Sequence, residues 1–291
     1  IRDLTVTGVQ TCALPILSEA IVAASASRSS FYAGMRVLPK AERQAMFAVY
    51  EFCRIVDDIA DDQQGERVQR RAQLDQWRRD LDVLYAGGDA GQAAFLAEAV
   101  QHFGLDRADF EAVIDGMATD VERDVRWPSE AELDLYCDRV ASAVGRLSVR
   151  IFGMDREPGL ALAHHLGRAL QYTNILRDID EDAAIGRVYL PAEALTGAGI
   201  NLTTPEQVVA DPRIDPVARA IAAKAHVHYR EAGAILAARP KGHLIAPRLM
   251  EIAYARLLRQ MERQGWAMPR KRVRTNKLLL IATVIRLMVI G

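Results

Sequence analysis

In each of two acidic stretches far apart in the chain, two aspartates stand four positions apart: Asp57 with Asp61, and Asp178 with Asp182. Four positions is about one helical turn, so each pair would lie on one face of a helix. Like charges at this spacing repel each other, and a bound cation would relieve that repulsion. Mg²⁺ suits such a site because it binds a few carboxylates and shares the oxygens of substrate phosphates. The sequence therefore predicts two acidic helix faces that hold Mg²⁺ around a diphosphate, with Mn²⁺ as the alternative ion.

The second acidic stretch gives the more specific signal. Gln171, Asn174, Asp178 and Asp182 follow one another at intervals of three and four, so they form one stripe along a helix and its continuation. Amide and carboxylate oxygens in line are suitable ligands for Mg²⁺. A polar stripe packed against another helix would explain one such stretch, and so would a solvated acidic face. The presence of both stretches in one chain favours a metal site.

Other polar residues flank the two stretches. Arg54 lies one turn before Asp57, Arg187 follows the second stretch, and Ser30 precedes the first long helix. A cation at Arg187 could reach a diphosphate or form a structural salt bridge. A hydroxyl at Ser30 could contact a phosphate or cap a helix. Asp120 belongs to a third acidic cluster, which on its own indicates a surface position.

Composition limits the classes of function. The chain has 291 residues, of which 50% are hydrophobic and 26% charged, as is typical of a globular protein with a sizeable core. The net charge of −1 gives no indication of nucleic-acid binding. Its three cysteines lie far apart without zinc or disulfide spacing, and the histidines show no metal-ligand spacing. We therefore expect a cytoplasmic protein without structural zinc.

Helical periodicity runs through most of the chain, and no stretch after residue 16 alternates as a strand would. The sequence thus predicts one all-α domain of roughly ten helices. A loop-rich segment is expected at about 186–212. Helices are expected at about 39–60, 66–85, 91–103, 107–122, 129–152, 158–181, 214–238 and 245–264.

The two ends of the chain differ from the domain between them. Residues 1–16 share no pattern with the rest of the chain and are expected to be a non-native extension, so the domain is expected at 17–275. The tail 276–291 is apolar and comes after the basic segment 270–274, but it is too short and interrupted to span a membrane. Such a tail could lie on an anionic membrane surface as a peripheral contact, or it could pack on the core.

The chain resembles the squalene/phytoene synthase family, whose members join two isoprenyl diphosphates head to head. The resemblance extends over about residues 18–275. Within the family it is closest to bacterial enzymes that make presqualene diphosphate for hopanoid biosynthesis, on the basis of Ser29–Tyr32, Asp178–Asp182 and Gly265-Trp266. The motifs that carry the family resemblance are Ser-Ser-Phe-Tyr at 29–32, Phe-Cys-Arg-Ile-Val-Asp-Asp-Ile-Ala-Asp at 52–61, Tyr-Cys-Asp-Arg-Val-Ala-Ser-Ala-Val-Gly at 136–145, Gln-Tyr-Thr-Asn-Ile-Leu-Arg-Asp-Ile-Asp-Glu-Asp at 171–182 and Gly-Arg-Val-Tyr-Leu-Pro at 186–191.

This resemblance implies an isoprenoid-synthase fold with helices around a central cavity, and it implies roles for particular residues. Tyr136 would act in the first half of the reaction. Asp120 would match an active-site aspartate if one residue is inserted before Tyr136. The implied Mg²⁺ ligands, four of them aspartates with catalytic roles, are Asp57, Asp61, Asn174, Asp178 and Asp182. The implied diphosphate contacts are Ser30, Arg54, Gln171 and Arg187.

The implied reaction is the condensation of two molecules of farnesyl diphosphate to presqualene diphosphate, with Mg²⁺ and without NADPH. Two related activities are alternatives: an NADPH-dependent squalene synthase, and a phytoene synthase that uses a longer substrate. A head-to-tail chain elongator fits less well, because the aspartate motif is not followed closely by a basic Arg-Arg-Gly. Outside enzymes, the chain could be a helical assembly factor that kept the fold, although such a protein would be expected to lose the acidic motifs.

Overall fold

The computed structural model describes residues 35–61, 65–274, 283 and 286–287 of the chain. Over these residues it contains helices and no strand, apart from one isolated bridge between Arg126 and Val188. The all-α prediction is therefore confirmed. In chain order the helices are α3 (Lys40–Asp61), α4 (Arg67–Tyr85), the 3₁₀ helix η1 (Gly91–Leu96), α5 (Ala97–Phe103), α6 (Arg107–Glu122), α7 (Glu130–Cys137), the π-helical turn η2 (Asp138–Ser142), α8 (Ala143–Ile151), α9 (Arg156–Arg177), α10 (Ile179–Ala184), α11 (Ala192–Gly197), α12 (Pro205–Ala210), α13 (Ile214–Ala237) and α14 (Ile245–Gln264).

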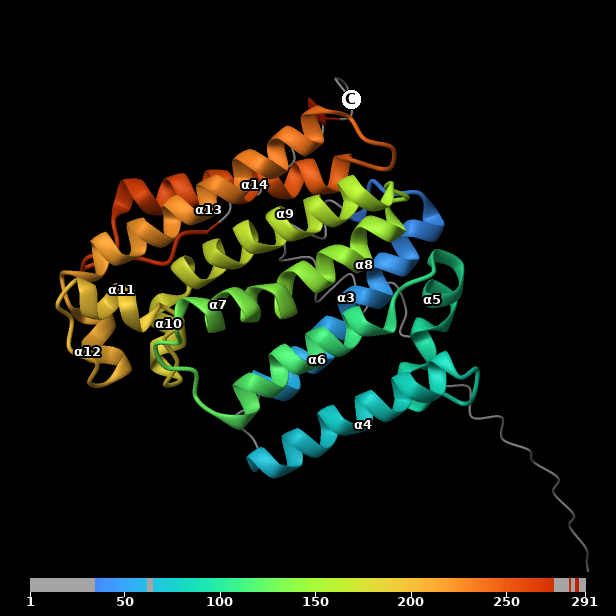
Figure 1. Cartoon of the computed structure of the whole chain (residues 1–291), viewed down its shortest axis with the longest axis horizontal. Helices are drawn as coiled ribbons and strands as arrows, with labels where there is room; N and C mark the ends of the chain where they lie inside the picture. The colour runs from blue at the N-terminus through green and yellow to red at the C-terminus, as the bar shows by residue number, and fades with distance from the viewer. Residues whose placement is uncertain (1–34, 62–64, 275–282, 284–285, 288–291) are drawn as a thin grey trace, which may run out of the picture.

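The long helices lie side by side, with α4 at one edge and α13 and α14 at the other (Figure 1). One buried cluster joins α3, α4 and α6, where Phe52 meets Trp77 and Phe110 edge to face at ring distances of 5.4 and 5.1 Å. A second buried cluster joins α9, α13 and α14. Helix α8 lies between the two and contributes Leu147 to the first and Val149 to the second. The short helices α10–α12 gather at one end of the bundle (Figure 1).

Most predicted helix boundaries agree with the structure to within a few residues, but two long helices differ from the prediction. The helix expected at 158–181 ends at Arg177, because Asp178 adopts φ −104° and ψ 15° before α10 begins. The helix expected at 129–152 contains the π-helical turn η2. The predicted start of that helix is confirmed, since Ser129 and Glu132 form a reciprocal capping box.

Helices α8 and α9 approach closely where both carry glycine. A Cβ atom built on Gly145 would lie 3.0 Å from the Cα of Ala163. One built on Gly167 would lie 2.8 Å from both the backbone N and the Cα of Ser142, in the π-helical turn. Any side chain at these positions would push the helices apart, so close helix packing explains why glycine is present.

We expect Gly167→Ala to lower the free energy of unfolding by about 1–3 kcal/mol, because the added methyl group meets backbone atoms that cannot move separately. Gly233→Ala is the matched control within α13. A Cβ there meets no atom within 4 Å, and alanine should stabilise the helix by up to about 1 kcal/mol. Chemical denaturation of both variants measures the two changes. Stability changes of the same sign would contradict this account of the packing.

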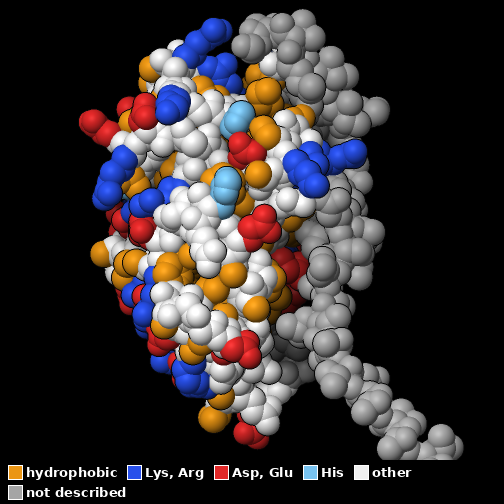
Figure 2. Space-filling view, turned by 90° about the vertical axis from the view of Figure 1, so that its right-hand side faces the viewer, with side chains coloured by type: hydrophobic (Ala, Val, Ile, Leu, Met, Phe, Trp, Pro, Cys, Tyr) orange, Lys and Arg blue, Asp and Glu red, His pale blue; other side chains and the backbone are white. Residues whose placement is uncertain are grey.

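Charge on the molecular surface is mixed. On the face in Figure 2, basic and acidic side chains are interspersed among hydrophobic ones, in keeping with the net charge of −1. None of the helices within the described ranges has the length and apolar character needed to cross a membrane.

Residues 1–16 and Ser30 lie outside the described residues, as does most of the tail 276–291. Where the tail is described, Thr283 is buried and accepts a hydrogen bond of 3.2 Å from Arg256 of α14, which favours packing on the core at that point.

Candidate active site

The first acidic stretch forms the C-terminal turns of α3. Asp57 is partly exposed and lies 3.8 Å from Nη1 of Arg54. Arg54, predicted to contact a diphosphate, donates a hydrogen bond of 2.9 Å to Asp58. Asp61 is the last residue of α3, and its side chain lies outside the described part of the structure. Asp57 and Arg54 are thus neighbours on one side of the helix end.

Arg187 connects the two acidic stretches. Its buried guanidinium donates a hydrogen bond of 3.1 Å to the carbonyl oxygen of Ala60, in the last turn of α3. Its backbone N–H donates to the carbonyl oxygen of Asp182 at 2.9 Å. The C-terminal end of a helix carries partial negative charge, so a cation at the end of α3 is stabilising. The two stretches, which the sequence separates widely, therefore meet at this residue.

The second acidic stretch turns at Asp178, between α9 and α10. Its carboxylate accepts hydrogen bonds of 2.8 Å from Nε of Arg177 and from Nε of Arg272. Arg272 also lies 3.3 Å from a carboxylate oxygen of Glu181. The segment after α14 brings Arg272 here because the indole nitrogen of Trp266 donates to the carbonyl oxygen of Leu176 at 2.9 Å, which holds that segment against the end of α9. Sequence reasoning gave Arg272 no role at the acidic stretch.

Asn174 provides the best structural test of whether the site suits a metal ion. Its amide nitrogen lies 3.5 Å from the side-chain oxygen of Gln171. Its side-chain oxygen is buried and accepts no hydrogen bond from any described residue. An unsatisfied buried acceptor of this kind costs about 1–3 kcal/mol, and a cation would satisfy it. Together with the nearby carboxylates, Asn174 thus offers the oxygen ligands that Mg²⁺ prefers.

A cluster of three side chains, of which Asp120 and Tyr189 are buried and Tyr136 is partly buried, lies beside the acidic stretches. Asp120 of α6 accepts hydrogen bonds of 2.9 Å from the hydroxyl of Tyr136 and 2.8 Å from that of Tyr189. The two phenol rings stack with their centres 5.0 Å apart. Burial raises the pKa of both tyrosines well above the usual value, and the charge of Asp120 raises it further. Asp182 is a smaller cause of the raised pKa at Tyr189, which links this cluster to the second acidic stretch.

The surface position that the acidic cluster alone indicated for Asp120 is wrong, because the packing of α6 buries this side chain and brings it into contact with Tyr136. Tyr189 was not predicted as a site residue. Its only signal in the sequence was its position in the motif at 186–191, immediately after the second acidic stretch. A phenol in that motif could not be assigned a partner, because Asp120 lies 69 residues earlier.

A helical bundle with two acidic stretches brought together at one end defines the class of isoprenoid synthases, and the chain has that fold. The chain belongs to the squalene/phytoene synthase family, whose model matches residues 24–278. It is accordingly a prenyltransferase.

Two relatives and two solved structures show how close the similarity is. The chain is 61% identical to the presqualene diphosphate synthase of Zymomonas mobilis over 264 residues, covering 91% of this chain and 90% of the relative. It is 52% identical to that of Rhodopseudomonas palustris over 258 residues, covering 89% and 92%. A squalene synthase HpnC from Alicyclobacillus acidocaldarius has a TM-score of 0.71 at 26% identity, covering 83% of this chain and 91% of the other. A dehydrosqualene synthase has a TM-score of 0.79 at 24% identity, covering 93% and 95%, and supports the fold alone.

Proposed function

We propose that this chain condenses two molecules of farnesyl diphosphate head to head into presqualene diphosphate, releasing one diphosphate and one proton. The observation that carries the proposal is the contact of Arg187 with the ends of both acidic stretches, next to the buried cluster of Asp120, Tyr136 and Tyr189. This arrangement supports a site in which carboxylates from both stretches hold a metal-bound diphosphate. The identity of 61% to a presqualene diphosphate synthase along nearly the whole chain supports the choice of product.

The proposed Mg²⁺ site takes oxygen ligands from both acidic stretches. When bound, Mg²⁺ offsets the negative charge that develops on a leaving diphosphate. The side-chain oxygen of Asn174, which has no partner within the described part of the chain, and the partly exposed carboxylate of Asp57 suit this role. Mn²⁺, which also favours oxygen ligands, would substitute. The residues proposed to hold the ion are Asp57, Asp61, Asn174, Asp178 and Asp182.

Basic and amide side chains around the carboxylates are proposed to position the diphosphates. Arg54 lies beside Asp57, and Gln171 lies beside Asn174. Ser30 is proposed as a further contact, although it lies outside the described residues. Arg272 pairs with Asp178. If the Asp178 carboxylate binds a metal ion instead, Arg272 could donate to a diphosphate oxygen. These groups would hold the diphosphate in place as its bond to carbon breaks.

The buried cluster is proposed to stabilise the allylic cation. Ionisation of one farnesyl diphosphate leaves the electron pair of the broken C–O bond on diphosphate and a positive charge on the farnesyl chain. The double bond of the second molecule attacks this cation, and loss of a proton closes the cyclopropane ring. Asp120 supplies negative charge in a buried setting, where it acts more strongly than in water. The raised pKa of Tyr136 keeps its phenol protonated, so that its hydroxyl continues to donate to Asp120.

Product analysis tests the proposal. The purified chain is incubated with farnesyl diphosphate and Mg²⁺, with and without NADPH, and separately with the C20 substrate geranylgeranyl diphosphate. We expect presqualene diphosphate and free diphosphate from the C15 substrate, whether or not NADPH is present. Squalene formed only with NADPH would identify a squalene synthase, and phytoene from the C20 substrate would identify a phytoene synthase. Failure to consume either substrate would favour an assembly factor.

A further inference from the structure

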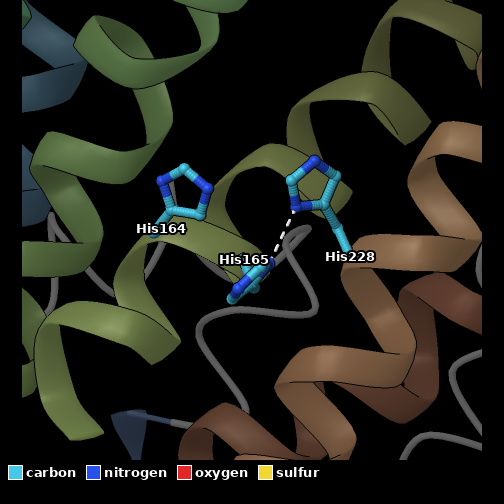
Figure 3. Close-up of side chains that lie close together, drawn as sticks. All are labelled: His164, His165 and His228. Carbon is cyan, nitrogen blue, oxygen red and sulfur yellow. Dashed lines mark hydrogen bonds between the residues drawn. The ribbon is translucent and has the colours of Figure 1, made fainter.

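Three histidines come together on the side of the bundle where α9 packs against α13. His164 and His165 belong to α9 and His228 to α13, and Figure 3 shows their rings grouped between the two helices. One ring nitrogen from each histidine lies within 4.8 Å of those of the other two. The sequence shows no metal-ligand spacing among these histidines, because His228 approaches the pair only through helix packing.

The contact between His165 and His228 already has nearly the geometry of a metal site. Their Nδ1 atoms lie 3.0 Å apart, so the two rings share one proton in a hydrogen bond. Two imidazole nitrogens bound to one tetrahedral Zn²⁺ ion, each about 2.0–2.1 Å from it, lie about 3.3 Å from each other. An ion could therefore replace the shared proton with a shift of a few tenths of an ångström.

Burial and nearby charges act on two of the three imidazoles. Burial first, and then the charges of His165, His164 and Arg168, lower the pKa of His228 to about 4. Burial also lowers the pKa of His164, with Arg168 as the next cause. A neutral imidazole has the free lone pair that a metal ion requires.

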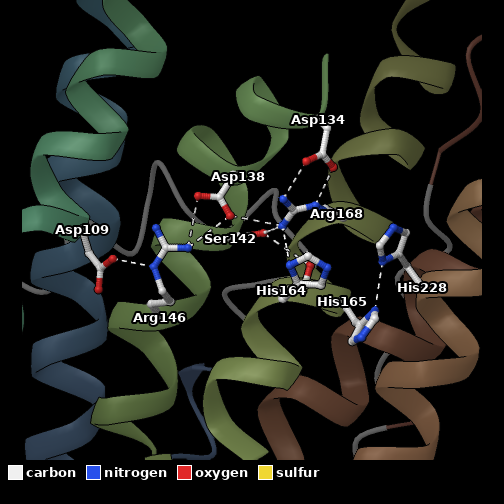
Figure 4. Close-up of polar contacts among 9 residues, drawn as sticks. All are labelled: Asp109, Asp134, Asp138, Ser142, Arg146, His164, His165, Arg168 and His228. Atoms are coloured by element: carbon white, nitrogen blue, oxygen red, sulfur yellow. Dashed lines mark hydrogen bonds and ion pairs between the residues drawn. The ribbon is translucent and has the colours of Figure 1, made fainter. Parts of the chain in front are cut away.

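A network of charged side chains adjoins the cluster (Figure 4). Arg168 donates to Nδ1 of His164 at 2.9 Å. The same guanidinium is held by Asp134, at 2.8 and 3.0 Å, and by Asp138 at 3.1 Å. Its positive charge is thus balanced by carboxylates. Because Nδ1 of His164 accepts from Arg168, the neutral ring carries its proton on Nε2. An ion can bind this ring at Nδ1 in place of Arg168, or at Nε2 after the proton moves to Nδ1, and the hydrogen bond from Arg168 is lost in both cases. His164 should consequently be the weakest of the three ligands.

We propose that His164, His165 and His228 form a site for a divalent transition metal ion of the Zn²⁺ type, with His165 and His228 as the principal ligands. Imidazole nitrogens select Zn²⁺, Cu²⁺ or Ni²⁺, whereas Mg²⁺ prefers oxygen. This site is therefore chemically distinct from the one proposed for Mg²⁺. A bound ion would connect α9 to α13, and α9 reaches Gln171 and Asn174 within the next three turns. It would hold in place the helix that carries two of the proposed active-site amides.

Metal titration of the full chain, prepared without a polyhistidine tag and in excess Mg²⁺, tests the proposal. We expect calorimetry to show a single Zn²⁺ ion bound per chain, and the electron paramagnetic resonance spectrum of bound Cu²⁺ to show nitrogen couplings. His165→Gln and His228→Gln should each weaken Zn²⁺ binding by at least about tenfold, and the exposed His164→Gln by less. Zn²⁺ should raise the melting temperature of the unsubstituted chain but not of His165→Gln.

His226→Gln is the matched control, because His226 lies on the same helix but pairs with Glu262 at 3.0 Å. It should bind Zn²⁺ as the unsubstituted chain does. The proposal is overturned if the chain shows no saturable Zn²⁺ binding, if His165→Gln and His228→Gln bind as tightly as the control, or if bound Cu²⁺ shows oxygen ligands alone. The electron paramagnetic resonance spectrum of Cu²⁺ bound to the unsubstituted chain tests the proposal even if the variants at the half-buried positions do not fold.

Discussion

Asp57→Asn should lower the rate of presqualene diphosphate formation by at least about 100-fold, whereas Asp58→Asn should change it less than about threefold. The amide keeps the shape of the side chain but loses the charge that the proposed Mg²⁺ site requires. Asp58, one residue further along α3, is more exposed and forms a surface pair with Arg54 at 2.9 Å. Such a pair contributes only about 0.3–0.5 kcal/mol. The two substitutions therefore make the same chemical change on the same helix turn with very different expected effects.

Steady-state rates at increasing Mg²⁺ concentration measure this difference. A weakened metal site should regain part of its rate at high Mg²⁺, so the Mg²⁺ concentration for half-maximal rate should rise in Asp57→Asn and stay constant in Asp58→Asn. Circular dichroism and melting temperature establish that both variants are folded. If Asp57→Asn keeps more than about a tenth of the rate, or if both variants lose it equally, Asp57 is not a ligand of the ion.

Much of the fold could be predicted from the sequence because its helices are amphipathic and their ends are marked by capping or helix-breaking residues. Helix α7 begins where a helix was predicted, at the capping box of Ser129 and Glu132, and α3 ends within a residue or two of the predicted position. These features depend on contacts within a few residues. At the break, Asp178 accepts a hydrogen bond from Arg272, 94 residues later, and no local pattern in the sequence predicts this contact.

The site shows the same division between local and distant information. The spacing of Gln171 and Asn174 on one helical stripe was enough to place them together. The role of Arg187 could not be predicted in the same way. Its acceptor is the backbone carbonyl oxygen of Ala60, and a backbone contact leaves no pattern in the sequence. The prediction offered a diphosphate contact or a salt bridge, and the structure adds a third function, joining the two acidic stretches. A contact between a side chain and a backbone atom leaves no motif in the sequence, so it cannot be predicted from one.

Asp120→Asn should lower kcat by about 10²–10⁴-fold, and Tyr136→Phe by about 10²-fold, with little change in KM. Asp120 is buried and accepts from two phenols, so the amide removes the negative charge and leaves one phenol hydroxyl facing an NH₂ group. Both substitutions disturb the hydrogen bond between Asp120 and Tyr136, so the double variant should lose less than the product of the two single losses. Burst and steady-state kinetics with farnesyl diphosphate measure these losses.

Tyr85→Phe is the control for the loss of a partly buried phenol hydroxyl. Tyr85 lies at the end of α4, away from the acidic stretches, and donates at 2.7 Å to the carbonyl oxygen of Leu105. It should lower stability by about 1 kcal/mol and leave kcat unchanged.

The pH profile of the rate distinguishes two roles for Tyr136, a protonated hydrogen-bond donor and a phenolate base. Its raised pKa means that the phenol stays protonated as the pH rises through the usual range of tyrosine, so the alkaline limb of the profile should be the same in Tyr136→Phe as in the unsubstituted chain. A rise in rate with pH over this range that disappears in Tyr136→Phe would instead make the phenolate a base in the reaction. A rise in KM with kcat intact would place the cluster in substrate binding rather than in stabilising the cation.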